Sequence, residues 1–231
     1  MPELPEVETV RAGLAEHLVR ATVSSIEISD VRSLKRNVAG VQGFVDELTG
    51  SRLESVVRRG KFLWLPISGS RALVGHLGMS GQILVRTPGF IPDPQTRVVI
   101  HVHTEAGDPL EIRFVDQRLF GGLMVDDLVP TPDSLPAGFS PEAEAAAVIP
   151  STVAHISRDL LDPHFDADAV ATKMSKKNSG IKRVLLDQNL LSGIGNIYAD
   201  ESLWLAKLHY DKPASAISKN KHLELIEIAK D

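Results

Sequence analysis

The chain has 231 residues, enough for one large domain or two modest ones, and its 43% hydrophobic and 24% charged residues exclude a disordered or fibrous protein. It contains no cysteine, which excludes a disulfide framework, a thiolate zinc site and a cysteine nucleophile. The net charge of −5 is unevenly spread. Residues 51–100 hold seven basic and two acidic side chains, whereas residues 101–150 hold two and nine, so a basic surface can lie on one side of an acidic molecule.

The first predicted element is a helix that runs from about Pro5 to Leu18. Val7, Val10 and Leu14 recur with Leu18 at helical spacing over about four turns. Proline suits the first turn of a helix, and two early glutamates suit its positive dipole end.

From about residue 22 to residue 125 the pattern changes to short β-type runs. Val98, Ile100 and Val102 alternate with more polar neighbours, as expected for a half-buried strand. Eight such strands with frequent glycines predict a sandwich or a barrel-like pair of antiparallel sheets. The expected strands are Val23–Ile28, Leu53–Arg58, Phe62–Ile67, Ala72–His76, Gln82–Val85, Val98–His103, Leu110–Val115 and Gly122–Val125.

The stretch Val129–Pro150 contains five prolines and predicts a linker with a short Ala/Glu-rich helix. Beyond it the pattern is helical. We therefore predict an α+β protein, with a helix and β-sandwich domain at residues 1–134, a linker at 135–150 and an all-helical domain at 151–231. The helices expected in the last domain are Ala167–Met174, Ile181–Leu186, Ile197–Ala206 and Lys221–Ala229.

The start of the chain is the first candidate chemical motif. Removal of Met1 would leave Pro2 with a free secondary amine, and an α-amino group has a pKa of about 7.7–8.0, so part of it is nucleophilic at neutral pH. Attack on a sugar C1′ would give a cationic iminium, an electron sink for later elimination. Glu3 stands beside the amine and could act as a general acid. The alternative is that Glu3 only caps the following helix.

The second motif, Arg58–Phe62, predicts a basic turn between two strands. Lys61 in this turn could hold a phosphate and donate protons during elimination. A solvated hairpin tip is the alternative.

Two further loops combine glycine with side chains that can enter DNA. The loop His76–Gly81 exposes Met79, and an apolar side chain on a loop can wedge between base steps. On another loop Arg118 can pair with an orphaned base edge and Phe120 can wedge into the stack. The alternative for Met79 is that it packs inward.

The fourth motif is a helix, a turn with two glycines and a second helix, from Ile181 to Glu201. Asn196 stands where the second helix needs its N-cap. Exposed backbone N–H groups and a helix N-terminus can receive a DNA phosphate. A tight connection between two helices is the alternative.

Together the motifs resemble bacterial formamidopyrimidine-DNA glycosylase. Residues 2–9, Pro-Glu-Leu-Pro-Glu-Val-Glu-Thr, are similar to the start of that family, and the turn around Asn196 resembles its helix–two-turn–helix motif. The four motifs occur in the order and spacing of the family, and the resemblance covers essentially the whole chain.

The resemblance implies a role for each site residue. Pro2 would be the Schiff-base nucleophile and Glu3 the general acid, with Glu6 as a supporting carboxylate. Lys61 would bind phosphate and donate a proton during elimination. The residues implied to contact DNA are His76, the void fillers Met79, Arg118 and Phe120, and the backbone contacts Lys177 and Asn196.

The implied activity is that of a base-excision-repair DNA glycosylase with AP lyase activity. It would remove oxidised purines such as 8-oxoguanine and formamidopyrimidines from damaged double-stranded DNA, through a Schiff base and β,δ-elimination without a metal. We expect a cytoplasmic, nucleoid-associated bacterial monomer with no membrane partner. Two alternatives are an endonuclease VIII-like enzyme for oxidised pyrimidines and a non-catalytic damaged-DNA-binding protein. The Pro-Glu-Leu-Pro start favours oxidised purines, and Pro2, Glu3 and Lys61 together speak against the non-catalytic alternative.

The sequence departs from the family pattern in two places. Gln95, Thr96 and Arg97 stand where the family usually has a DNA-contacting histidine. Family members also continue beyond the equivalent of Asp231 with a lesion-capping loop and a four-cysteine zinc hairpin. We expect the sequence to be part of a longer protein, and structural zinc only if that protein carries the hairpin.

Overall fold

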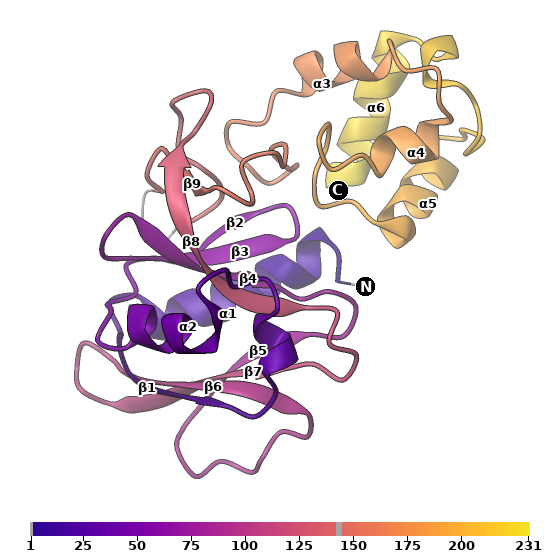
Figure 1. The fold of residues 1–231 in the computed structure, drawn as a ribbon. Coiled ribbons are helices and arrows are strands. Elements are labelled where there is room, and N and C mark those ends of the chain that lie inside the picture. Colours follow the sequence, from indigo (N-terminus) through magenta and orange to yellow (C-terminus); the bar gives the residue numbers. More distant parts are fainter. Residues whose placement is uncertain (1, 142–144) are drawn as a thin grey trace. The chain divides into compact units, whose positions relative to one another are not determined.

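The computed structural model describes residues 2–141 and 145–231. These residues form two compact units, one that extends to Ala154 and one that comprises His155–Asp231, and each is described by itself. The first unit contains a leading helix and two antiparallel sheets, and the second is helical (Figure 1). The predicted α+β class is confirmed.

The leading helix α1 (Leu4–Leu18) begins where the sequence predicts. Pro5 occupies the first turn, where its missing N–H group costs no hydrogen bond, and Glu6 lies at the positive end of the helix dipole. Its buried residues recur every three or four positions, so one face is directed into the core, and it contacts strands of both sheets. The buried residues are Leu4, Val7, Arg11, Leu14, Ala15 and Leu18.

Two sheets form the sandwich, and each of the eight predicted strands overlaps an observed one, but the strand predicted at Leu53–Arg58 forms only at Val57–Arg59. One sheet has the order β1-β6-β7-β5 and the other the order β2-β3-β4-β8-β9. The first comprises β1 Thr22–Ile28, β5 Gln82–Arg86, β6 Thr96–His103 and β7 Pro109–Val115. The second comprises β2 Val57–Arg59, β3 Phe62–Ile67, β4 Arg71–His76, β8 Gly122–Pro130 and β9 Val148–Pro150.

The core lies between the inner faces of these sheets and α1. In β6 the alternation predicted from the sequence is confirmed, because Val98, Ile100 and Val102 are at most 1% exposed while their neighbours are more accessible. They join one apolar cluster with residues of α1 and of both sheets. The loops that carry the candidate site residues therefore begin and end at strands of a close-packed core.

Three elements in the described part of the first unit were not predicted. The helix α2 (Gly40–Leu48) buries Phe44 and Leu48, and a short 3₁₀ helix η1 spans Val31–Leu34. Strand β9 forms inside the predicted linker, where it pairs with the extended end of β8. Of the predicted Ala/Glu-rich helix in that segment, residues 142–144 lie outside the described part of the chain.

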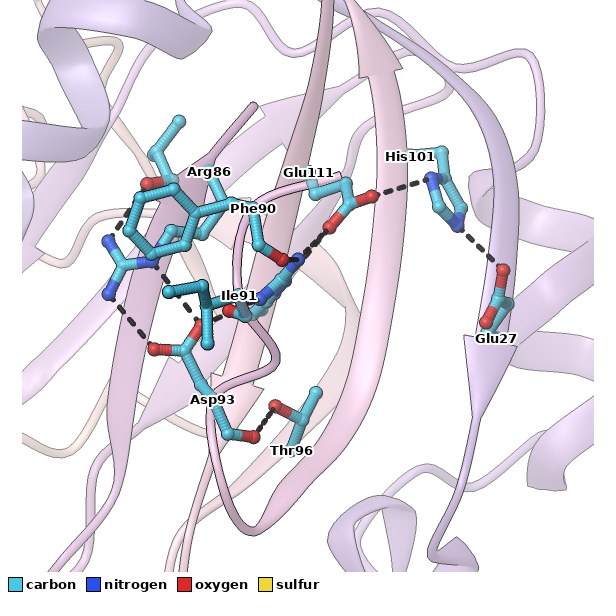
Figure 2. Close-up of polar contacts among 10 residues, drawn as sticks. Glu27, Arg86, Phe90, Ile91, Asp93, Thr96, His101 and Glu111 are labelled. Atoms are coloured by element: carbon cyan, nitrogen blue, oxygen red, sulfur yellow. Dashed lines mark hydrogen bonds and ion pairs between the residues drawn. The ribbon is translucent and has the colours of Figure 1, made fainter. Parts of the chain in front are cut away.

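The outer face of the four-stranded sheet carries a network of charged side chains (Figure 2). Arg113 in β7 is buried and donates to Asp93 at 2.9 Å, to Glu111 at 2.8 Å and to the carbonyl oxygens of Phe90 and Ile91. These bonds hold the segment between β5 and β6 down on the sheet.

The second unit contains four α-helices in its described residues. Asp166 caps α3 by accepting from the N–H of Ala169 at 2.9 Å, and Ser218 caps α6 by accepting from the N–H of Lys221. In the part of the chain that the structure describes, no helix is both long and apolar enough to span a membrane. The helices are α3 Ala167–Met174, α4 Ile181–Leu185, α5 Asn196–Leu205 and α6 Lys219–Lys230, with a 3₁₀ turn η2 at Ala214–Ala216.

Candidate active site and nucleic-acid interface

The N-terminus of α1 carries the three residues predicted to begin the reaction. Pro2 is half-buried and Glu3, the N-cap of the helix, is 3% exposed. Glu3 and Glu6 form a reciprocal capping box, in which the N–H of Glu3 donates to Glu6 Oε2 at 3.1 Å. The predicted capping role of Glu3 is therefore present, and Glu6 fixes the backbone next to Pro2. Met1, whose removal the proposed chemistry requires, lies outside the described residues.

A buried ion-pair cluster ties this helix to the basic turn. Glu8 accepts from Arg11 Nε at 2.8 Å and from Arg58 Nε at 2.7 Å. The side chains of the two arginines are 1% and 0% exposed. Both guanidinium groups also lie over the ring of Phe139, at 5.5 and 5.6 Å from its centroid. The cluster therefore connects α1 with β2, the strand that leads into the turn with Lys61.

The turn between β2 and β3 differs from a solvated hairpin tip. Arg59 is 4% exposed, Gly60 is buried with a φ of 55°, and Lys61 is only partly exposed. Burial lowers the pKa of Lys61, and the negative charges of Glu3 and Glu6 act in the opposite direction. Lys61 therefore lies within electrostatic reach of the carboxylates at the start of α1. The structure thus brings together the predicted catalytic residues of the first unit.

His76 closes β4 directly opposite Phe62 of β3. The two rings pack with centroids 4.7 Å apart, and His76 Nδ1 accepts from the N–H of Gly78 at 3.2 Å. Burial, followed by the positive charges of Arg36 and Lys61, lowers the pKa of His76 to about 4. His76 is consequently neutral at neutral pH, and because Nδ1 accepts a hydrogen bond, the ring proton resides on Nε2.

The three predicted void fillers occupy two loops of the first unit that contact each other. Met79 is 45% exposed on the loop between β4 and β5, so the alternative in which it packs inward is wrong. Phe120 is 50% exposed on the loop between β7 and β8. Arg118, also exposed, places Nη1 3.8 Å from the sulfur of Met79. The structure thus exposes two apolar side chains and one guanidinium on neighbouring loops.

The helix–turn–helix segment lies in the second unit, and one prediction about it is wrong. Gly195, not Asn196, is the N-cap of α5, because Gly195 has the extended backbone of a cap whereas Asn196 is the first helical residue. The turn is held by Gln188, which accepts from the N–H of Gly193 at 2.9 Å and donates to the carbonyl oxygens of Leu186 and Ile194. Asn196 remains exposed at the start of the helix.

Lys177, the other predicted backbone contact, follows α3 in the same unit. Its side chain is 48% exposed, and Nζ lies 3.5 Å from Asp187 Oδ2. An exposed ion pair of this length contributes little to stability, so the ammonium can exchange Asp187 for another anion at low cost.

Sequence reasoning missed the residues that support the site. Glu8 and Asp116 lie close in the sequence to candidate site residues, but nothing in their spacing shows that their carboxylates accept from donors in distant segments. At the position expected for a family histidine, Arg97 Nε donates to the carbonyl oxygen of Asp116 at 2.9 Å, so this arginine supports the loop that carries Phe120. Among the described residues, no group of three or more His, Cys, Asp or Glu side chains could hold a metal ion.

Comparison with known proteins assigns the family. Residues 1–123 match the formamidopyrimidine-DNA glycosylase N-terminal domain, and residues 156–231 match the formamidopyrimidine-DNA glycosylase H2TH domain. The formamidopyrimidine-DNA glycosylase of Leifsonia xyli is 53% identical over 95% of this chain and 73% of its own length. That of Nocardioides is 45% identical over the whole chain and 72% of its own length.

The fold agrees with solved relatives. The Lactococcus lactis protein in complex with abasic-site DNA is 28% identical with a TM-score of 0.77, covering 99% of this chain and 76% of the other. A complex of the LlFpg protein with THF-DNA and an inhibitor gives a TM-score of 0.78 at the same identity, over 99% and 77% of the two chains. The chain therefore belongs to the formamidopyrimidine-DNA glycosylase family.

Proposed function

We propose that this chain excises oxidised purines from double-stranded DNA and then cleaves the strand, with Pro2 as its nucleophile. Membership in the family supports the reaction class, that of a DNA glycosylase with AP lyase activity. The observation that carries the residue assignment is the convergence of Pro2, a buried Glu3 and a partly buried Lys61 on the start of α1.

The proposed first step needs an unprotonated amine and an acid. Once Met1 is removed, the secondary amine of Pro2 attacks C1′ of the flipped nucleotide, and the bond from C1′ to the base breaks. Glu3 gives its proton to the sugar or the base as that bond breaks. Glu6 holds the N–H of Glu3, which limits the conformations available to Pro2.

The second step cleaves the DNA backbone. The C1′–O4′ bond then opens, and O4′ gains a proton to replace the one lost from the Pro2 nitrogen, which gives the iminium. Loss of a C2′ proton from the iminium expels the 3′ phosphate, and a further elimination, with loss of the C4′ proton, expels the 5′ phosphate. Lys61 contacts a phosphate and supplies a proton in this stage. Its lowered pKa favours such proton exchange, because less free energy separates its two protonation states near neutral pH. The route uses an amine, carboxylates and an ammonium group and calls on no metal.

DNA recognition is assigned to residues of both units. In the first, Met79 and Phe120 enter the space left by the flipped nucleotide, Arg118 pairs with the orphaned base, and His76 donates from Nε2 as a neutral group. In the second, Lys177 and Asn196 contact phosphates. We propose that the protein acts as a monomer in the bacterial cytoplasm. The four-cysteine zinc hairpin of the family would need a further segment, because the 231 residues include no cysteine.

Borohydride trapping tests the nucleophile. The protein is incubated with a duplex that carries a formamidopyrimidine lesion, the intermediate is reduced, and the crosslinked peptide is mapped by mass spectrometry. We expect the DNA on the N-terminal peptide, attached at Pro2. A crosslink on Lys61, or an active mature protein that retains Met1, would contradict the assignment. Glu3→Gln is the matched variant, and it should still be trapped at a pre-formed abasic site while releasing little damaged base.

A further inference from the structure

The two loops that carry Met79, Arg118 and Phe120 are joined by one buried carboxylate. Asp116 is 0% exposed, and it accepts from Ser80 Oγ at 2.6 Å on the first loop. On its own loop it accepts from the N–H of Arg118 at 3.1 Å and from the N–H of Gly121 at 2.9 Å. The two loops therefore share a single charged acceptor.

These bonds determine which way the loop residues point. Because the N–H groups of Arg118 and Gly121 converge on one carboxylate, the three residues from Arg118 to Phe120 form a short arch outside it. Leu119 at its centre adopts a φ of 56°, and its carbonyl oxygen accepts from Lys35 Nζ at 3.0 Å. Phe120 is consequently held outward rather than free to fold back into the core.

The backbones of the two loops are also in close contact. A Cβ atom on Gly78 would lie 2.4 Å from the nitrogen of Gly121, and one on Gly121 would lie 2.6 Å from the carbonyl oxygen of His76. No side chain fits between them, so a shift of one loop must displace the other. The two loops are thus packed backbone against backbone as well as joined through Asp116.

The base of this arrangement is itself fixed. The N–H of Asp116 donates to the carbonyl oxygen of Gln95 at 3.2 Å, and its carbonyl oxygen accepts from Arg97 Nε at 2.9 Å. The segment that supplies both residues is held down by Asp93, whose carbonyl oxygen accepts from Thr96 Oγ1 at 2.6 Å, in the network of Figure 2.

We infer that Asp116 is a positioning residue that presents Met79, Arg118 and Phe120 to DNA in a preformed arrangement. This inference rests on the proposed function of those three side chains. A buried carboxylate must compensate its desolvation with hydrogen bonds. The Asp116 carboxylate accepts three, from Ser80, Arg118 and Gly121, and all three donors lie in the two DNA-directed loops. Preorganised loops avoid the loss of conformational freedom that ordering on DNA would require.

The test is Asp116→Asn, which keeps the size of the side chain but turns one acceptor into an N–H donor that opposes a loop N–H. Single-turnover excision is measured on a lesion in a fully paired duplex and on the same lesion in an unpaired bubble. We expect the excision rate to fall about tenfold or more on the duplex, because a buried polar group is left unsatisfied. In the bubble, where little unstacking is needed, the rate should fall by less than about threefold.

Asp126→Asn is the matched control. Asp126 also accepts from several donors in the first unit, including Ser151 Oγ at 2.7 Å and the N–H of Thr152 at 2.8 Å, but it serves a different segment. Its ratio of duplex to bubble rates should stay within about twofold of the wild type, as for a substitution with no role in DNA binding. Ser80→Ala removes only one of the three bonds and should give an intermediate ratio, so it carries the test if Asp116→Asn does not fold.

A double-mutant cycle separates positioning from general damage. In a Phe120→Ala background, Asp116→Asn should lower the duplex rate by a smaller factor than it does in the wild type, because one of the three side chains that it positions is already absent. Equal losses on duplex and bubble, or full additivity with Phe120→Ala, would overturn the inference. If the wild type excises the lesion and Phe120→Ala is impaired while Asp116→Asn is unaffected, only this inference fails. A wild type inactive on both substrates, or a fully active Phe120→Ala, refutes the proposed function as well.

Discussion

Glu8→Ala should destabilise the first unit strongly, although Glu8 takes no part in the proposed chemistry. The side chains of Arg11 and Arg58 are 1% and 0% exposed, and the substitution removes the carboxylate that both contact. Removal of one partner from a buried ion pair costs about 3–5 kcal/mol. Because the Glu8 side chain is itself 20% exposed, we expect the lower end, about 3 kcal/mol.

Urea unfolding followed by tryptophan fluorescence measures this loss. Trp64 in β3 is 1% exposed, so its emission reports unfolding of the first unit, whereas Trp204 in the second unit is 80% exposed and contributes little change. With an m-value of about 2 kcal/mol per M, a loss of 3 kcal/mol lowers the midpoint by about 1.5 M. The shift should persist in high salt, because buried pairs are weakly screened.

The control is Glu16→Ala, an exposed glutamate of the same helix, which should change stability by less than about 0.5 kcal/mol. If Glu8→Ala moves the midpoint by less than about 0.5 M, the cluster contributes no more than a surface pair and the reasoning fails. Below its unfolding range, Glu8→Ala should also cleave abasic DNA more slowly than Glu16→Ala, because the start of α1 and the Lys61 turn lose their shared anchor.

Three further predictions follow from single residues. The pKa of His76 is lowered from 6.5 to about 4. The stability that the neutral ring contributes is therefore fully present above pH 6.5 and is lost as the pH falls to 4. His76→Gln should reduce this loss of stability at acid pH by up to about 3 kcal/mol in pH-dependent urea titrations, and an unchanged profile would refute this. Gly78→Ala places a Cβ atom at a left-handed φ of 61° and against the backbone of Gly121. It should lower Tm more than Gly69→Ala, where a Cβ meets nothing within 4 Å and only about 1–2 kcal/mol of backbone strain applies. Equal Tm losses in the two variants would contradict the loop contact. Lys177→Ala should weaken binding to damaged and undamaged duplexes alike and flatten the salt dependence by about one unit of slope, and a loss confined to damaged DNA would argue against a phosphate contact.

The sequence by itself determined the class of the fold and the family. The fold class could be predicted because its signals are local: the alternation in β6, the apolar runs separated by glycines and the proline at the start of α1. In each case the spacing of apolar residues along a short segment indicates a strand or a helix. The motif residues were likewise visible, because nucleophile, acid and phosphate-binding groups lie in short segments. Elements without a clear period were not predicted: α2 contains two glycines in nine residues, and β9 is a three-residue strand that exists only because the end of β8 is available to pair with it.

Only the tertiary structure decided which charged residues support the site. Nothing local to Asp116 indicates that its carboxylate accepts from Ser80, 36 positions away, and nothing local to Glu8 indicates that it meets Arg58, 50 positions away. The N-cap of α5 was also misplaced by one residue, because cap identity depends on backbone angles rather than on residue type alone. The free energy of a buried charge depends on the groups around it, and those groups come from segments that are distant in the sequence.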